Sequence, residues 1–157
     1  MRRPKPTIGW REWISLPDLG VQRIKAKVDT GARSSSLHAS SIEVVERDGE
    51  QIVRFSINAG QPAAVGEAPV TLCCEAPLHD QRQIRSSDGR QELRPVIRTR
   101  IEALGESWEI DLTLTSRDLM GFPMLLGREA TRRRFVVDPG RSFLLRRLEA
   151  QRLKQED

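Results

Sequence analysis

Residues 24–38 read "IKAKVDTGARSSSLH", an alternating segment that runs into a glycine-containing turn. Apolar residues alternate with lysines up to Val28, which is the period-two pattern of a strand with one buried face. The strand then runs directly into Asp29, Thr30, Gly31 and Ala32. Aspartate supplies a carboxylate, a threonine hydroxyl hydrogen-bonds within a loop, and glycine permits a close backbone approach. The same tripeptide also suits an Asx turn that closes a strand, so by itself it leaves both interpretations open.

The alternation continues outward from this stretch along most of the chain. Residues 108–115 form the clearest predicted strand, and Asp48-Gly49 between two further alternating runs is a hairpin signal. The Asp-Pro-Gly at 138–140 is predicted to turn the chain back into a strand at 142–148. This pattern of short strands and turns predicts an all-β fold, either a closed barrel or a sandwich.

The composition is that of a soluble globular protein, with 38% hydrophobic and 31% charged residues in a chain of 157. No apolar run approaches the roughly 20 residues needed to cross a bilayer, and the basic N-terminus lacks the apolar segment of a secretory signal. Cys73 and Cys74 are adjacent, so on a strand they point to opposite faces and suit neither a shared metal nor a routine disulfide. We therefore expect a cytoplasmic protein.

The charge balance is basic, with a formal net charge of +4 that comes mostly from arginine. Such a balance favours an anionic partner, for example nucleic acid, phosphate or an acidic peptide. Aromatic residues make up only 4% of the chain and tyrosine is absent, which removes the stacking platforms expected of a single-strand binder. A basic nucleic-acid-binding barrel is therefore a weaker alternative, and the arginines equally suit a solvated surface.

A second motif lies far downstream, where residues 124–128 read "MLLGR". An apolar strand leading into Asp-Thr-Gly-Ala, a polar stretch with a hydroxyl at Ser35, and a later apolar run ending in Gly-Arg together resemble the retropepsin-like aspartic proteases. The closer resemblance is to a bacterial branch labelled ATP-dependent zinc proteases and associated with glutamate ligases, which residues 8–20, 29–39 and 121–129 match. The resemblance implies a single-lobe, closed retropepsin-like β-barrel with one short C-terminal helix.

The resemblance also implies the site residues. Asp29 is the implied catalytic residue. The active-site loop and the second signature comprise Thr30, Gly31, Ala32 and Ser35, and Leu126, Gly127 and Arg128, respectively. Residues 79–95 occupy the place of the flap, the lid that closes over substrate. The flap residues expected to bind substrate are Arg82, Arg85, Ser87, Asp88, Gly89 and Arg90.

One domain is expected over residues 8–147, between an N-terminal tail at 1–7 and a C-terminal tail at 148–157. Residues 59–69, rich in Gly, Pro and Ala, are predicted to be a loop. Helical signal is limited to one or two turns within 127–134 and to a frayed helix in the C-terminal tail.

The zinc and ATP of the branch label find no support in the residues. A zinc hydrolase usually needs three protein ligands and an open position for water, but the only histidines are His38 and His79, and no His-Glu-x-x-His is present. The chain also lacks a Gly-x-x-x-x-Gly-Lys-Ser/Thr phosphate loop. We expect no metal and no cofactor, with His38 a structural imidazole and His79 a residue of the polar hairpin.

Aspartic proteolysis uses two carboxylates about 3 Å apart that share one proton. Only one Asp-Thr-Gly is present, so the resemblance predicts a homodimer in which Asp29 meets Asp29 of the partner subunit across a two-fold axis. The expected function is an aspartic endopeptidase. Because guanidinium groups pair well with carboxylates, the flap arginines suggest acidic or glutamate-rich peptides as substrates. The main alternative is a non-catalytic module that binds a peptide in the same cleft.

Overall fold

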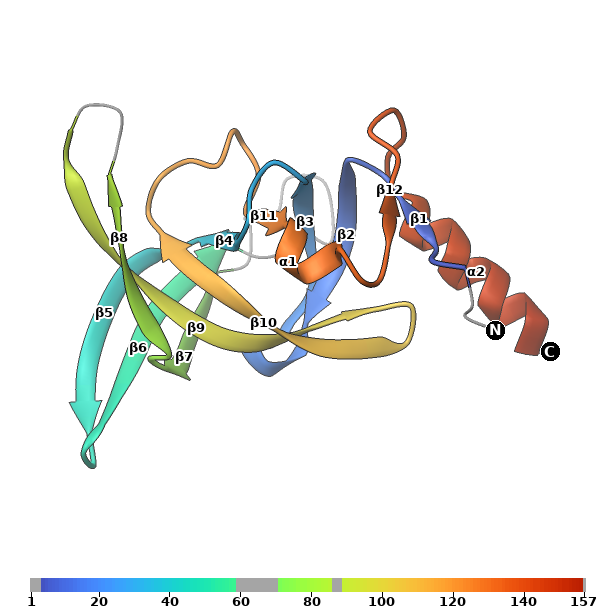
Figure 1. Ribbon diagram of the computed structural model, residues 1–157. Helices are drawn as coiled ribbons and strands as arrows, with labels where there is room; N and C mark the ends of the chain where they lie inside the picture. Colours follow the sequence, from blue (N-terminus) through green and yellow to red (C-terminus); the bar gives the residue numbers. More distant parts are fainter. Residues whose placement is uncertain (1–3, 59–70, 86–88, 157) are drawn as a thin grey trace, which may run out of the picture.

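Strands make up most of the computed structural model, which describes residues 4–58, 71–85 and 89–156 (Figure 1). The expectation of a mostly-β, single-domain fold is confirmed. Within the described ranges, no helix combines the length and apolar character needed to span a membrane. The elements in chain order are β1 (Thr7–Ile8), β2 (Arg11–Leu16), η1 (Pro17–Leu19), β3 (Val21–Asp29), β4 (Ser35–His38), β5 (Ser40–Arg47), β6 (Glu50–Asn58), β7 (Thr71–Pro77), β8 (Asp80–Arg85), β9 (Gln91–Ala103), β10 (Glu106–Thr115), β11 (Met124–Gly127), α1 (Arg128–Thr131), β12 (Val136–Val137) and α2 (Leu144–Glu156).

The main sheet returns on itself. Its strand order is β10-β4-β11-β3-β2-β9-β8, and β10 also pairs with β9. That additional pairing joins the strands from β10 to β9 into a ring and leaves β8 attached to the outside of β9. A closed barrel has no free sheet edges, and the predicted barrel stays a prediction beyond this pattern of strand pairing.

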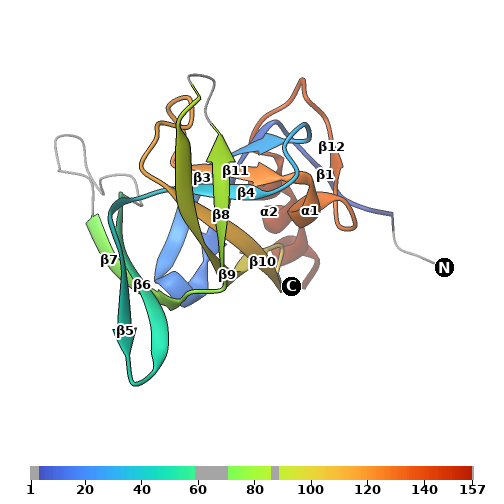
Figure 2. The ribbon, with the colours of Figure 1, turned by 60° about the vertical axis from the view of Figure 1, so that its left-hand side comes forward.

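The middle of the ring brings distant segments of the chain together. β11 lies between β3 and β4, parallel to the first and antiparallel to the second, and Figure 2 shows the three strands side by side. Parallel neighbours need a long crossover connection, which the segments from β4 to β10 provide here. The register places Gly127 opposite Asp29, so the two sequence motifs meet at one end of the ring.

The predicted alternation in β3 is confirmed. Ile24, Ala26 and Val28 are buried, while Lys25 and Lys27 are half-buried on the opposite face. A slip of one residue would turn the lysines inward, and burying an aliphatic side chain stabilises by about 1.5–3 kcal/mol, so the register is strongly specified. The other strands of the ring contribute fully buried side chains to the same core, among them Leu37, Leu112, Leu114, Met124 and Leu126.

A separate three-stranded sheet, with order β5-β6-β7, is inserted between β4 and β8. Figure 1 shows its β5–β6 hairpin projecting away from the ring on the same side as β8. The predicted turn at Asp48-Gly49 joins β5 to β6, and both residues have positive φ, 54° and 81°. Positive φ at both central residues is the geometry of a type I′ hairpin turn. The predicted loop at 59–69 lies outside the described residues.

The C-terminal segment differs from its prediction. The predicted strand at 142–148 is wrong, because helix α2 begins at Leu144. Glu12 in β2 is fully buried, and its carboxylate accepts hydrogen bonds from the backbone N–H of Leu144 at 2.8 Å and of Leu145 at 3.0 Å. These are donors that a helix N-terminus leaves unsatisfied. A partner more than a hundred residues away in sequence starts this helix, so local alternation could not reveal it.

Candidate active site

Asp29 ends β3, and its side chain is partly exposed. The chain turns there: the backbone N–H of Gly31 donates to Asp29 Oδ1 at 3.0 Å, and that of Ala32 donates to the Asp29 carbonyl at 3.2 Å. A Cβ on Gly31 would lie 3.3 Å from Asp29 Oδ1, so glycine leaves this approach open. The Asx turn that the tripeptide suits is therefore present, and it holds the carboxylate in one orientation.

The second signature packs directly against this loop. Gly127 is opposite Asp29 in the register of β3 and β11, and its backbone N–H donates to the buried Ser35 hydroxyl at 3.0 Å. A Cβ on Gly127 would lie 2.5 Å from the Ser34 carbonyl carbon and 2.9 Å from the Arg33 carbonyl oxygen, well inside the normal contact distance. Residue 127 and the segment at residues 33–34 can therefore approach this closely only because residue 127 is glycine.

The residues after Gly127 hold the far end of the loop. The backbone N–H of Arg128 donates to the Ala32 carbonyl at 2.8 Å, and its guanidinium Nη1 donates to the Gly31 carbonyl at 3.2 Å. The backbone N–H of Glu129 donates to the Arg33 carbonyl at 3.1 Å, and their side chains form an exposed ion pair at 2.7 Å. The loop that follows Asp29 is thus fixed by contacts with the second signature at Gly31, Ala32, Arg33 and Ser35.

Two other predicted residues lie on opposite sides of this assembly. Leu126 is 1% exposed and supports the loop from the core. Thr30 is exposed, and its hydroxyl forms no hydrogen bond with another residue of the described part of the chain. The same holds for Asp29 Oδ2. Both groups therefore retain hydrogen-bonding capacity at the surface.

The segment predicted to be a flap contains the hairpin of β8 and β9, which pair from Asp80 opposite Val96 to Arg85 opposite Gln91, and its role as a flap stays a prediction. Figure 1 shows this hairpin rising on the same side of the ring as the segment between β10 and β11. Gly89 has a φ of 84° on the return of the turn. Ser87 and Asp88, which we expected to contact substrate, lie outside the described residues.

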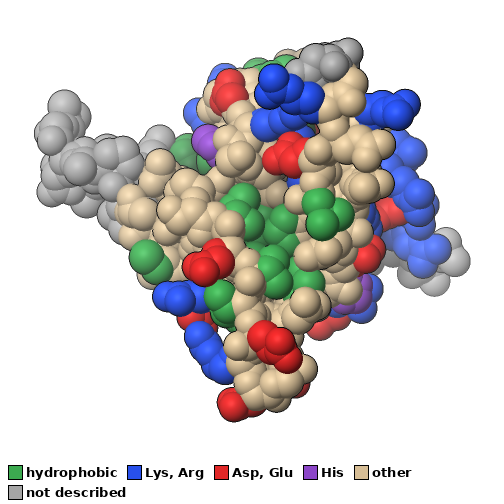
Figure 3. Space-filling model, turned by 90° about the vertical axis from the view of Figure 1, so that its left-hand side faces the viewer, with side chains coloured by type: hydrophobic (Ala, Val, Ile, Leu, Met, Phe, Trp, Pro, Cys, Tyr) green, Lys and Arg blue, Asp and Glu red, His purple; other side chains and the backbone are tan. Residues whose placement is uncertain are grey.

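Two basic residues of the β8–β9 hairpin, Arg82 and Arg94, have acidic neighbours in the same chain. Arg82 Nη2 lies 3.6 Å from an Asp111 oxygen, and Arg82 Nε lies 3.9 Å from Asp80. Arg94, the most buried arginine of the hairpin, lies 3.2 Å from Glu92. Figure 3 shows the face that carries this hairpin, where Lys and Arg side chains are mixed with Asp and Glu. Carboxylates of the same chain therefore neutralise part of the positive charge of the hairpin.

Sequence reasoning missed Asp111, which joins the base of the flap to the ring. Its Oδ1 lies 3.2 Å from Arg98 Nε and 3.7 Å from His79 Nε2, in addition to its approach to Arg82. A signal for one of these contacts was present in the sequence. β9 and β10 form a hairpin around Leu104-Gly105, and counting outward from that turn pairs position 98 with position 111.

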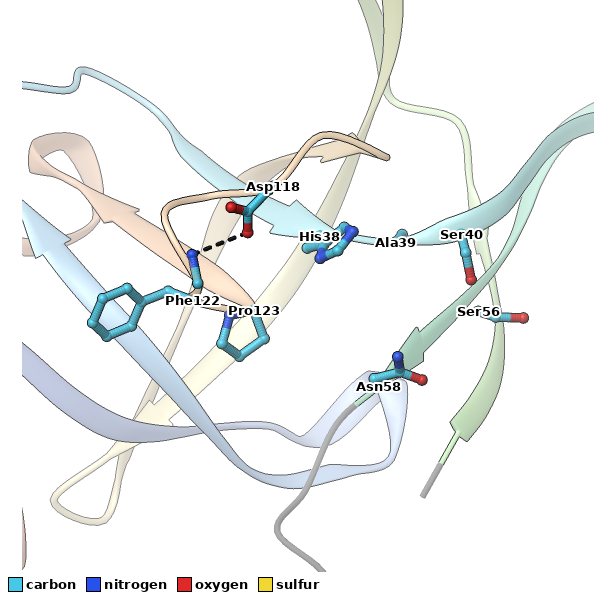
Figure 4. Close-up of a pocket in the computed structure, with 9 residues that line it drawn as sticks. His38, Ala39, Ser40, Ser56, Asn58, Asp118, Phe122 and Pro123 are labelled. Atoms are coloured by element: carbon cyan, nitrogen blue, oxygen red, sulfur yellow. Dashed lines mark hydrogen bonds between the residues drawn. The ribbon is translucent and has the colours of Figure 1, made fainter. Parts of the chain in front are cut away.

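His38 ends β4, which runs antiparallel to β11, so it lies at the opposite end of the ring from Asp29. It lines a pocket of about 260 Å³ at the junction of β4, β5, β6 and the loop before β11. Figure 4 shows Asp118 across from His38, with the Asp118 carboxylate turned back to accept a hydrogen bond from the Gly121 N–H at 3.0 Å. The His38 backbone N–H donates to the Pro123 carbonyl at 2.8 Å. Within the described ranges, no three His, Cys, Asp or Glu side chains are grouped to hold a metal ion.

Comparisons with known proteins place this geometry in a family. A family model described as "Retropepsin-like aspartic endopeptidase RimB" matches residues 7–147. Two curated proteins named "Probable alpha-L-glutamate ligase" are 47% identical over 138 residues (Shewanella pealeana) and 46% identical over 135 residues (Desulfotalea psychrophila). The matches cover 88% and 86% of this chain but 29% and 28% of those relatives, so the chain spans less than a third of their length.

A solved structure supports the same fold. A Legionella pneumophila protein of unknown function (DUF785) matches with a TM-score of 0.71 and 28% sequence identity. The match covers 89% of this chain and 98% of that chain. The likeness therefore extends over most of both chains rather than over one supersecondary unit.

Proposed function

The chain belongs to the RimB-like family of retropepsin-like aspartic endopeptidases, and we propose on that premise that it hydrolyses peptide bonds as a homodimer. The observation that carries the proposal is the meeting of the two motifs. Asp29 is held in an Asx turn by the Gly31 N–H, and the loop is fixed by hydrogen bonds to Gly127 and Arg128. A carboxylate at the end of a strand, partly exposed and held in one orientation, is what a general base requires.

The chemistry needs a second carboxylate. In the proposed dimer, Asp29 and Asp29 of the partner subunit lie about 3 Å apart and share one proton, because two like charges that close cannot both ionise. The ionised carboxylate takes a proton from water while the water oxygen attacks the scissile carbonyl carbon, and the protonated carboxyl gives its proton to the carbonyl oxygen. In the second step a hydroxyl proton returns to the dyad, the dyad protonates the leaving nitrogen, and the C–N bond breaks. The dyad ends with the single proton with which it began.

Two surface groups support a partner at this place. The Thr30 hydroxyl and Asp29 Oδ2 have no recorded hydrogen bond within the described part of the chain. Polar groups at a two-fold axis meet their own copies, so each of these groups would find a partner in an isologous interface. In this arrangement Thr30 braces the two loops across the axis.

We further propose that the substrates are acidic peptides. The relatives that share this domain are named as glutamate ligases, and the flap hairpin carries arginines whose planar forks pair with carboxylates. Arg82 and Arg94 already approach acids of their own chain, and Arg85, exposed at the end of β8, is the flap position proposed for such contacts.

The test compares the wild-type protein with Asp29→Asn. Hydrolysis of acidic and neutral peptides is followed by mass spectrometry, and the solution mass is measured at the same protein concentration. We expect the variant to lose hydrolysis and to keep both its fold and its dimeric mass. Retained hydrolysis in Asp29→Asn, or a strict monomer that is active, would overturn the dyad. An inactive wild-type protein that binds peptides would leave the family fold as a peptide-binding module.

A further inference from the structure

Four cations share the outward face of β2 and β3, and we call them the cationic face: Arg11, Arg23, Lys25 and Lys27. The inward positions of the same strands are buried, so these side chains are displayed on one side of the sheet. In the cross-strand register, Arg11 is directly opposite Lys27. Like charges directly opposite on neighbouring strands are destabilising, which makes this placement unfavourable for folding alone.

The cationic face also lacks internal compensation. None of its four members forms an ion pair with another residue of the described ranges. Arginines on the neighbouring strand β9 differ in this respect, since Arg98 pairs with Asp111 at 3.2 Å and Arg100 with Asp18 at 2.7 Å. The uncompensated charge is thus concentrated on β2 and β3, and an anionic ligand would neutralise it.

Aromatic rings lie against three of these cations, Arg11, Arg23 and Lys25. The Arg23 guanidinium lies 4.7 Å from the Trp13 ring centroid, and Lys25 Nζ lies 5.9 Å from the same ring. Lys25 Nζ also lies 5.6 Å from the Phe122 centroid. The rings therefore position the charges through cation–π contacts. Because Trp13 is also stacked on Phe143 at 6.1 Å, its faces are occupied, and it offers no free platform for a nucleic-acid base.

The row of cations on β3 leads to the candidate catalytic residue. The members of this row are spaced two residues apart along β3: Arg23, Lys25, Lys27 and Asp29. From Lys25 onward they alternate with the buried residues of the strand. Side chains on one face of an extended strand are about 6.6–6.8 Å apart, which is also the spacing of same-face side chains in an extended peptide. An extended peptide with acidic side chains therefore matches the row in both charge and repeat.

We propose that the cationic face binds carboxylates of an extended, acidic peptide segment next to the bond that Asp29 cleaves. The inference rests on the proposed function only in its last step, the path to Asp29; the binding itself needs no hydrolysis. Lys27 is the member nearest to Asp29 in sequence, and its Nζ lies 3.5 Å from Met120 Sδ in the loop before β11. Lys25 and Lys27 are therefore the positions at which acidic side chains close to the scissile bond would be selected.

The test measures binding with the Asp29→Asn protein, so that no peptide is consumed. Fluorescence anisotropy follows labelled hexaglutamate, hexaglutamine and a single-stranded RNA hexamer at two salt concentrations. We expect hexaglutamate to bind in a salt-dependent manner and Lys25→Glu with Lys27→Glu to weaken it about tenfold or more. A matched control, Arg146→Glu with Lys154→Glu, makes the same change in net charge on exposed positions of α2 and is expected to change the affinity less than about twofold.

A milder pair, Lys25→Gln with Lys27→Gln, keeps the test valid if charge reversal disturbs the fold, and circular dichroism checks each variant. Equal affinities for hexaglutamate and hexaglutamine, or equal losses in the β3 and α2 variants, would overturn the proposal. Tighter RNA binding that disappears with the β3 lysines would assign the face to nucleic acid instead. Failure of the proposed function gives a different result, in which wild-type protein hydrolyses nothing while the selective binding of hexaglutamate remains.

Discussion

Replacing Gly127 with alanine tests whether the two motifs are held together by a contact that only glycine permits. The added Cβ would lie 2.5 Å from the Ser34 carbonyl carbon and 2.9 Å from the Arg33 carbonyl oxygen, and closer still to the Ser34 oxygen. Ordinary contacts between carbon atoms are about 3.5–4.0 Å, so residue 127 and the segment at residues 33–34 must separate by about 1 Å. Gly127 has a φ of −82°, which alanine adopts freely, so the whole effect comes from this contact.

The magnitude follows from two costs. Overpacking of a tightly packed site costs about 1–3 kcal/mol. Separation of these two segments also stretches the buried hydrogen bond from the Gly127 N–H to the Ser35 hydroxyl. Such a bond contributes about 0.5–1.5 kcal/mol. We expect Gly127→Ala to lose about 2–4 kcal/mol of unfolding free energy, and peptide hydrolysis to fall because the Asp29 loop shifts.

Urea unfolding followed by tryptophan fluorescence and circular dichroism measures the change in stability. Gly140→Ala is the matched control, because its Cβ would meet only Asp138 Oδ1 at 3.4 Å and its φ lies outside the positive range. That substitution is expected to be neutral or to stabilise by about 0.4–1 kcal/mol through the unfolded chain. The same unfolding midpoint for Gly127→Ala and the wild-type protein would show that the contact at residue 127 tolerates a Cβ.

Three further predictions concern the support of the fold and the two thiols. Glu12→Gln is expected to lower the free energy of unfolding in urea by about 2–4 kcal/mol. The buried carboxylate accepts three backbone hydrogen bonds, from Gly9, Leu144 and Leu145, and an amide cannot accept all three. A loss below about 0.5 kcal/mol would contradict this. Ser35→Ala leaves the buried Gly127 N–H without its acceptor and is expected to cost about 1–3 kcal/mol, with a parallel loss of hydrolysis; an unchanged unfolding midpoint would argue against it. Iodoacetamide is expected to label exposed Cys73 and to spare Cys74 in the folded protein, because burial raises the pKa of the Cys74 thiol and keeps it protonated; equal labelling by mass spectrometry would show the reverse.

Much of the candidate site could be predicted from sequence because its determinants are local. The alternation up to Val28 sets which face of β3 is buried, and that parity brings Asp29 to the exposed side. The Asp-Gly pair at 48–49 encodes its own turn, since both residues tolerate positive φ. The polar, turn-containing segment between the motifs forms the β8–β9 hairpin, whose role as a flap stays a prediction; Ser87 and Asp88 lie outside the described residues.

Other features depend on partners that are distant in sequence. The start of α2 is set by Glu12, which lies 132 positions from Leu144, so the pattern at 142–148 predicted a strand where a helix forms. The pairing of Arg82 with Asp111 depends on how β8 lies against β9 and β10. The cationic face is also a product of packing, because Trp13 and Phe122 come from β2 and from the loop before β11.

Local sequence is sufficient to predict that a strand delivers one carboxylate into a glycine turn, because strand parity and turn chemistry act over a few residues. Folding then places Gly127 against that turn, where the contact excludes a Cβ, and gathers four cations on one face of β2 and β3, where none of them has an ion pair within the described residues. Packing and long-range electrostatics depend on distances in space. No local pattern of residues contains those distances until the chain has folded.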